Sequence, residues 1–188
     1  MPNLVLASSS PRRALLLGSA GFTFDQVFPE VEETPLDDES PEDRVVRLAR
    51  AKALAVEDPG AVSIGADTTV VLDGVALGKP HDEGEAIEMI QTLGGRTHVV
   101  ISGWALARDG AIVEDGLEAT LVTMREIASD EAAAYVDSGE PMGKAGAYAI
   151  QGDGKQFVTD IAGPRSNVIG LPLRAVVAAL ERAGVMPG

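Results

Sequence analysis

The chain has 188 residues, of which 45% are hydrophobic and 23% charged, a balance typical of a globular protein that can bury a sizeable core. Its 29 acidic residues outnumber its 15 Lys and Arg residues, and the net charge of −14 disfavours a nucleic-acid or anionic-membrane partner. Without cysteine, the chain has no disulfides, thiolate metal sites or cysteine nucleophiles. No apolar stretch approaches the roughly 18 residues of a membrane span, and no signal-like segment opens the chain, so we expect a cytoplasmic protein.

The first half of the chain predicts strands alternating with helices. An apolar run at 3–7 is typical of a short buried strand, and Ser-Ser-Ser-Pro at 8–11 predicts a serine-capped helix that continues to about residue 21. Ser-Pro-Glu-Asp at 40–43 predicts a second helix, which ends near residue 56. The run 62–77, which turns at Asp-Gly, predicts a β-hairpin.

The second half of the chain mixes hairpins with helices. We expect helices at 82–93, 129–138 and 172–184, a hairpin of strands 98–107 and 111–114, a separate strand at 117–125, and irregular glycine-rich chain over most of 139–170. This order indicates an α/β fold with a mixed, partly antiparallel sheet. No repeat or linker interrupts it, so residues 1–188 are expected to form one domain.

A cluster of hydroxyls and cations marks the start of the first predicted helix. Arg12 and Arg13 fall in its first turn, where positive charge opposes the helix dipole and is normally unfavourable. A bound anion would reverse that penalty, since Ser8, the exposed amides and both guanidiniums together suit a di- or triphosphate. The alternative is a capped helix with solvated arginines.

Two further charged residues occupy apolar surroundings. Lys52 follows Val45, Leu48 and Ala49 on one face of its predicted helix, so its stem would be buried while its ammonium reaches either an enclosed site or solvent. Asp67 lies inside an apolar strand and needs a partner to offset its desolvation. That partner is a metal ion, a transferred proton or, in a purely structural role, backbone amides.

Two familiar motifs are absent. The segment 74–79 has three residues between its glycines instead of four, and Pro80 replaces the magnesium-binding Ser or Thr of a P-loop. The only histidines, His81 and His98, lack metal-ligand spacing and have no neighbouring Ser and Asp in a hydrolase motif. Zinc-dependent hydrolysis is therefore not expected.

Ordered short motifs along almost the whole chain resemble those of the Maf family of nucleotide pyrophosphatases. They cover about residues 4–180 and lie at 7–13, 32–35, 47–53, 65–68, 77–80, 94–98, 144–148, 150–152 and 167–172. The resemblance implies an ITPase-like (Maf/Ham1) fold, in which a mixed twisted sheet with flanking helices forms two lobes around a central cleft. It also implies hydrolysis of nucleoside triphosphates to monophosphate and pyrophosphate, dependence on a divalent cation such as Mg²⁺ or Mn²⁺, and a homodimer.

The resemblance also assigns roles to individual residues. Asp67 matches the proposed general base of the family, and Glu33 matches its acidic metal-binding partner. Arg13, Lys52 and Lys79 match its phosphate-binding cations. The role of an acid in metal binding is put in doubt by Gly143, which stands where the family usually has one. Ala149 replaces a usual glycine.

The matching branch of the family acts on dTTP and UTP, and Arg12, Thr68 and Gln151 match the positions that mark it. A threonine hydroxyl and a glutamine amide each offer a donor and an acceptor, which suits the O4 and N3–H edge of uracil or thymine. Two alternatives stay open at this point. One is a 7-methyl-GTP pyrophosphatase, and the other is a nucleotide-sensing inhibitor of septum formation that binds without turnover.

Overall fold

The computed structural model describes residues 3–188. Its elements, in chain order, are β1 (Leu4–Ala7), α1 (Pro11–Ser19), β2 (Asp25–Val27), α2 (Pro41–Leu54), β3 (Val62–Leu72), β4 (Val75–Leu77), α3 (Glu83–Leu93), β5 (Thr97–Arg108), β6 (Ala111–Met124), α4 (Ser129–Asp137), the 3₁₀ turns η1 (Ala145–Ala147) and η2 (Asp153–Phe157), β7 (Val158–Ala162), α5 (Arg165–Ile169) and α6 (Leu173–Arg182). None of the helices in residues 3–188 has the length and apolar character needed to cross a bilayer.

The seven strands form one sheet in the order β2-β1-β3-β5-β6-β7, and β4 pairs with β3. β1 runs parallel to β2 and β3, whereas β3–β4 and β6–β7 are antiparallel. The predicted α/β class and mixed sheet with flanking helices are therefore confirmed. The chain divides into two compact units, 1–68 with 102–118 and 170–188, and 69–101 with 119–169. The central cleft and the single domain stay predictions.

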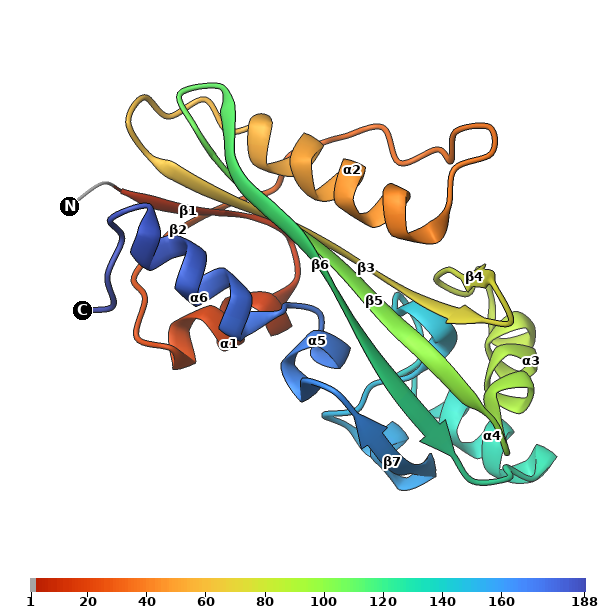
Figure 1. The fold of residues 1–188 in the computed structure, drawn as a ribbon. Helices are drawn as coiled ribbons and strands as arrows, with labels where there is room; N and C mark the ends of the chain where they lie inside the picture. Colours follow the sequence, from red (N-terminus) through yellow and green to blue (C-terminus); the bar gives the residue numbers. More distant parts are fainter. Residues whose placement is uncertain (1–2) are drawn as a thin grey trace. The chain divides into compact units, whose positions relative to one another are not determined.

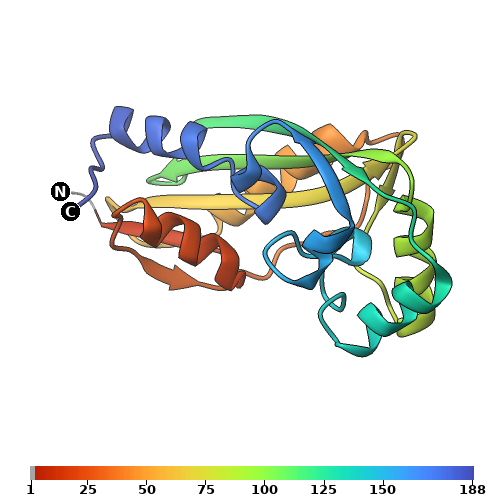
Figure 2. The ribbon, with the colours of Figure 1, turned by 90° about the horizontal axis from the view of Figure 1, so that it is seen from below.

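In the first unit, helices cover both faces of the sheet (Figure 1). Leu6, Leu17, Ile64, Trp104 and Val176 belong to the apolar cluster that joins the strands to α1 and α6. Seen from below, these two helices lie in front of the strands (Figure 2). The opposite face carries α2 on a small cluster made only of alanines, Ala49, Ala53, Ala105 and Ala107, with Ile112 packed against it.

Two glycines let α2 approach the strands closely. A Cβ at Gly65 of β3 would collide with the backbone of Ala49 and Ala53, and one at Gly103 of β5 would collide with the backbone of Val45. Ser63 of β3 donates a hydrogen bond to the Ala53 carbonyl at 2.7 Å. Helix α2 therefore rests on strand backbone, which fixes the height of its side chains above β3.

The second unit has its own core beneath α3 and α4. Its buried residues include Val70, Ile90, Val122, Tyr135 and Phe157. Asp82 caps α3 by accepting a hydrogen bond from the Glu85 amide at 2.9 Å. Helices α3 and α4 lie side by side in both views (Figures 1 and 2).

Three strands differ from the sequence predictions. The two strands expected at 111–114 and 117–125 are one continuous strand, β6. A Cβ at Gly116 would lie 2.9–3.0 Å from the Trp104 indole, so this glycine makes room for an aromatic ring and does not end a strand. Strand β7 falls in the segment predicted to be irregular, and β2 was not among the predicted strands. Each pairs with one neighbour in the sheet order.

Candidate active site

The segment between β1 and α1 places a serine hydroxyl at the end of a parallel strand. Ser8 directly follows β1, and its Oγ accepts hydrogen bonds from the Ser10 amide at 3.2 Å and from Arg13 Nη1 at 3.1 Å. Ser10 is the N-cap residue of α1, but its own side chain makes no capping bond. The helix start was thus predicted correctly, while the hydroxyl that meets the nearby amide belongs to Ser8.

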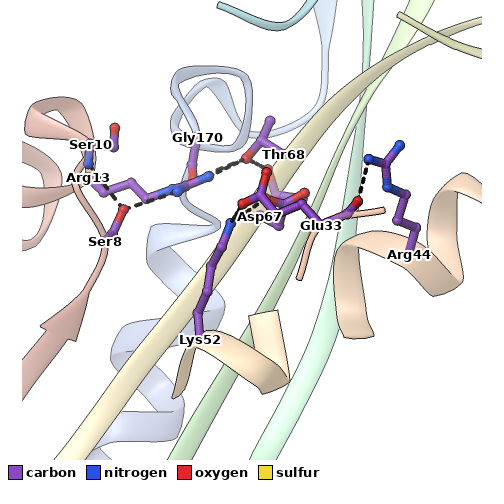
Figure 3. A network of polar contacts seen from close by, with 10 residues as sticks. Ser8, Ser10, Arg13, Glu33, Arg44, Lys52, Asp67, Thr68 and Gly170 are labelled. Atoms are coloured by element: carbon purple, nitrogen blue, oxygen red, sulfur yellow. Dashed lines mark hydrogen bonds and ion pairs between the residues drawn. The ribbon is translucent and has the colours of Figure 1, made fainter. Parts of the chain in front are cut away.

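The Arg13 guanidinium is held by three partners (Figure 3). Besides Ser8, Nε donates to the Gly170 carbonyl at 2.7 Å and Nη2 donates to Thr68 Oγ1 at 3.2 Å. Burial lowers the pKa of Arg13 below its ordinary value; the charge of Asp67 opposes this shift, that of Arg12 adds to it, and that of Glu33 opposes it. These contacts use three of the five N–H groups of the guanidinium, so two remain for an anion.

A lysine joins two carboxylates next to this arginine (Figure 3). Lys52 Nζ lies 2.8 Å from Asp67 Oδ1 and 2.8 Å from Glu33 Oε1. The Lys52 side chain is only 13% exposed and that of Asp67 19%, whereas Glu33 is 52% exposed. The predicted burial of the Lys52 stem is confirmed, and its ammonium supplies the partner that the strand carboxylate needs.

Strand alternation explains how these groups reach the site. Ser63, Gly65 and Asp67 of β3 all contact α2, and the next residue, Thr68, contacts Arg13 of α1. Successive side chains of a strand point to opposite faces. Because β1 pairs with β3 only as far as Gly65, Asp67 and Thr68 lie beyond the carboxyl end of β1, where α/β sheets commonly bind ligands.

The loop that carries Glu33 is held to α2 by two arginines. Arg44 donates to the Glu33 carbonyl at 2.9 Å, and Arg47 donates to the Thr34 carbonyl at 3.1 Å. Arg47 also forms a two-pronged ion pair with Glu39 at 2.5 and 2.8 Å. The hydrogen bond from Arg47 lowers the pKa of Glu39 to about 2, so the Arg47–Glu39 ion pair is charged at neutral pH.

The carboxylates of Glu33 and Asp67 could bind a divalent cation only together with other ligands. Among residues 3–188, no group of three or more His, Asp or Glu side chains is arranged to hold a metal ion. Glu33 and Asp67 nevertheless approach one ammonium together, and Mg²⁺ is typically bound by one or two carboxylates completed by phosphate oxygens and water. The donor set therefore fits a metal that arrives with a phosphorylated ligand.

Comparison with known proteins identifies the family. The Maf-like protein family matches residues 3–183. The chain belongs to the Maf family. Maf relatives named dTTP/UTP pyrophosphatase include those of Geotalea uraniireducens, 47% identical over 98% of this chain and 96% of the relative, and Myxococcus xanthus, 50% identical over 97% and 93%.

A solved structure is similar at lower identity. The nucleoside-triphosphatase, or dITP/XTP pyrophosphatase, of Mycobacterium abscessus covers 98% of both chains at 18% identity, with a TM-score of 0.42.

The remaining predicted residues of this Maf chain divide between the two units. Arg12 is half-buried at the second position of α1 in the first unit. Lys79 and Gln151 are exposed residues of the second unit. The segment of Lys79 is joined to η1 by a hydrogen bond from the Gly146 amide to the Gly78 carbonyl at 3.0 Å.

Glu140 holds the turn that carries Gln151. Its carboxylate accepts hydrogen bonds from the Tyr135 hydroxyl at 2.7 Å and from the amides of Asp153 and Gly154 at 3.0 and 3.1 Å. Burial acts to raise the pKa of Glu140, but the hydrogen bonds outweigh it and the pKa is lowered. Glu140 lies three residues before Gly143, the position where the family usually has an acid. Its carboxylate accepts hydrogen bonds from Tyr135, Asp153 and Gly154.

Two groups around Arg13 and Thr68 were not predicted from the sequence. Ser102 Oγ lies 2.8 Å from Thr68 Oγ1, and the Gly170 carbonyl contacts both Arg13 and Thr68. A fully buried serine within the apolar run of β5 was a usable signal, because such a hydroxyl needs a partner. The Gly170 carbonyl gave none, since every residue has one.

Proposed function

We propose that this protein hydrolyses dTTP and UTP to the nucleoside monophosphate and pyrophosphate. The proposal rests on one observation. Arg13, at the start of α1, interacts through its charge with Asp67 and Glu33, the two carboxylates that form ion pairs with Lys52. Cations suit a triphosphate, and two carboxylates beside them suit its hydrolysis. Maf relatives 46–50% identical and named dTTP/UTP pyrophosphatase support the choice of substrate.

The cations bind and orient the triphosphate. The two unused N–H groups of Arg13 and the start of α1 meet phosphate oxygens, while Ser8 keeps the guanidinium in place. Lys52 and Lys79 supply further positive charge as the P–O bond breaks and charge develops on the pyrophosphate.

Asp67 acts as the base that takes a proton from the water attacking the α-phosphate. Lys52 binds Oδ1, so Oδ2 is the atom that accepts the proton. Glu33 and Asp67 are the residues that would hold a Mg²⁺ or Mn²⁺ ion. When bound, the ion neutralises phosphate oxygens and lets this strongly acidic protein accept an anionic substrate.

A non-catalytic nucleotide sensor is the alternative from another class. Two carboxylates beside an anion site oppose simple anion binding through like-charge repulsion, which favours turnover. Within the enzymes, a 7-methyl-GTP pyrophosphatase is the alternative, and substrate preference separates the two. Arg12, Thr68 and Gln151 are our candidates for selecting the pyrimidine base.

Product analysis on a panel of triphosphates tests the proposal. We expect kcat/KM for dTTP and UTP to exceed that for ATP, GTP and 7-methyl-GTP, with pyrophosphate released only in the presence of a divalent metal. Preference for 7-methyl-GTP would overturn the pyrimidine assignment. Nucleotide binding without release of pyrophosphate from any of these substrates, with metal present, would establish the sensor.

The proposal extends to assembly and location. It takes residues 1–188 as one domain that forms a homodimer in the cytoplasm. Light scattering after size exclusion tests the dimer.

A further inference from the structure

We infer that Glu140 and Tyr135 set the base preference of this protein by holding the turn that carries Gln151. The inference rests on the proposed function, in which Gln151 helps to select the base. It makes Glu140 and Tyr135 positioning residues, which act on the substrate only through Gln151.

Gln151 is the exposed residue of a turn that is otherwise anchored in the second unit. Its neighbour Ile150 is 3% exposed and belongs to the core of that unit, whereas Gln151 is exposed. The turn closes with a hydrogen bond from the Gly152 amide to the Ala149 carbonyl at 3.3 Å. The position of the Gln151 side chain therefore depends on how the backbone of this turn is held.

The carboxylate of Glu140 holds the chain that follows Gln151. It accepts hydrogen bonds from the amides of Asp153 and Gly154, the first two residues of η2, at 3.0 and 3.1 Å. The first amides of a helix have no partner within the helix, and the N-cap residue here, Gly152, has no side chain to offer one. Glu140 supplies the missing acceptors from a separate segment of the chain.

The hydroxyl of Tyr135 holds the chain that precedes Gln151. It accepts a hydrogen bond from the Ala149 amide at 3.1 Å and donates one to Glu140 at 2.7 Å. The lowered pKa of Glu140 keeps its carboxylate ionised at neutral pH, so the carboxylate can only accept, just as the amide can only donate. The Tyr135 ring is itself fixed by an edge-on contact with Phe157, at 5.3 Å between ring centroids. The two side chains thus join both sides of the turn.

Two glycines leave room for these side chains. A Cβ at Gly152 would lie 2.0 Å from a carboxylate oxygen of Glu140, and one at Gly154 would lie 2.6 Å from the Tyr135 hydroxyl. Both distances are far shorter than van der Waals contact, so the turn approaches Glu140 and Tyr135 as closely as bare backbone allows.

The discriminating experiment measures base preference after these contacts are broken. Glu140→Gln keeps the size of the side chain, but one of its two acceptor oxygens becomes an NH₂ group that faces another donor. We expect kcat/KM to fall more for UTP than for GTP, so that their ratio decreases about tenfold, the value of one hydrogen bond to the base. Inhibition by inorganic tripolyphosphate, which has no base, should stay unchanged.

Tyr135→Phe tests the same inference without touching the carboxylate. It removes the hydroxyl and keeps the ring that packs on Phe157. We expect the UTP to GTP ratio to fall in this variant too, and it answers the question if Glu140→Gln does not fold.

A double variant shows whether the effect passes through Gln151. Once Gln151→Ala has removed the amide, adding Glu140→Gln should leave the UTP to GTP ratio at the value of Gln151→Ala alone. A further fall equal to that caused by Glu140→Gln in the parent protein would overturn the inference.

Glu131→Gln is the matched control. Glu131 is another acid of the second unit, and its carboxylate pairs with Arg125 and accepts a hydrogen bond from the Ala128 amide. This variant should be less stable than the parent but keep the parent's UTP to GTP ratio. If Glu140→Gln and Tyr135→Phe also keep that ratio, or if tripolyphosphate inhibition weakens with it, Glu140 and Tyr135 support only the fold and the inference is wrong.

Failure of the proposed function is distinguishable from failure of the inference. If the unsubstituted protein hydrolyses no triphosphate, the function fails, and calorimetric affinities for UTP and GTP replace kcat/KM in the same comparison. A smaller base preference in Glu140→Gln than in Glu131→Gln then supports the inference. Equal preferences in the two variants, or no binding of either nucleotide by the parent protein, contradict it.

Discussion

The Lys52 ammonium balances two negative charges that would otherwise repel each other. It lies 2.8 Å from Asp67 and 2.8 Å from Glu33, and the Lys52 and Asp67 side chains are only 13% and 19% exposed. A carboxylate in such surroundings keeps its charge only with a partner. Lys52 therefore gives the proposed base a positively charged partner before any substrate arrives.

Replacing the proposed base should separate binding from turnover. In Asp67→Asn the side chain keeps its size and can still accept a hydrogen bond from Lys52, but it cannot take a proton. We expect kcat to fall by about 10²–10⁴-fold, with the affinity for a nonhydrolysable UTP analogue largely kept. Steady-state kinetics and calorimetric titration measure the two quantities.

Asp115→Asn is the matched control for that substitution. Asp115 is an acidic residue of the same unit that pairs with Arg50 outside the site. It should leave kcat unchanged. A wild-type kcat in Asp67→Asn would remove this residue from the chemistry.

A buried histidine makes stability depend on pH. His98 is 1% exposed, with Nε2 2.8 Å from the Tyr148 hydroxyl, and burial lowers its pKa from 6.5 to about 4. As the pH falls below 6.5, the unfolded chain binds a proton that the folded chain refuses until about pH 4. The contribution of His98 to the free energy of unfolding is thus intact above pH 6.5. It decreases between pH 6.5 and 4, by about 3 kcal/mol in total.

Urea unfolding at a series of pH values checks this contribution. The His98→Gln variant should lose the part of the pH slope that lies between pH 6.5 and 4. Parallel curves for the two proteins would show that His98 does not titrate there.

Most residues of the cation–carboxylate cluster could be predicted, and most of their supports could not. Arg13, Lys52 and Asp67 stood out because each was charged where its local pattern made charge costly. Ser102 and the Gly170 carbonyl come within reach of Thr68 only through the tertiary fold, because they lie 34 and 102 residues away from it in the chain. The spacing of residues along the sequence does not indicate hydrogen bonds between such distant positions.

At the level of elements, the position of α2 depends on two strand glycines that have no side chain facing the helix. Gly65 and Gly103 admit the helix to a distance that no side chain would permit, and Lys52 projects from that helix to Asp67. In Gly65→Ala the new methyl group must push the helix outward. We expect a loss of about 1–3 kcal/mol in the free energy of unfolding, and a fall in kcat/KM as Lys52 moves away from Asp67.

Urea unfolding and steady-state kinetics measure both effects. Gly18→Ala is the control, since a Cβ at Gly18 meets nothing within 4 Å and alanine favours a helix. That variant should be as stable as the parent or slightly more stable. An unchanged Gly65→Ala protein would mean that α2 tolerates displacement.

The elements that sequence analysis missed are those whose burial pattern is weak. All three residues of β2 are exposed, so no alternation of apolar and polar residues marks it. β7 is a half-exposed strand next to glycine-rich chain. The hairpin turns were predicted well because Asp73-Gly74 and Asp109-Gly110 all have positive φ, the conformation that such turns require.

For the whole molecule, the two compact units are not successive stretches of chain. Strands β3, β5 and β6 each contribute residues to both, with boundaries after Thr68, Ile101 and Glu118. Unfolding one unit would break strands that belong to the other as well. We therefore expect a single cooperative transition, with equal calorimetric and van't Hoff enthalpies in scanning calorimetry. Two resolved transitions would contradict the assignment of one domain.

The placement of the aromatic residues gives each unit its own intrinsic optical label. The sole tryptophan, Trp104, is buried in the first unit, whereas both tyrosines, Tyr135 and Tyr148, are buried in the second. Tryptophan emission thus follows one unit, and tyrosine absorbance changes follow the other. Recorded on the unmodified protein, the two signals let the melting of each unit be followed separately, without dyes or engineered chromophores.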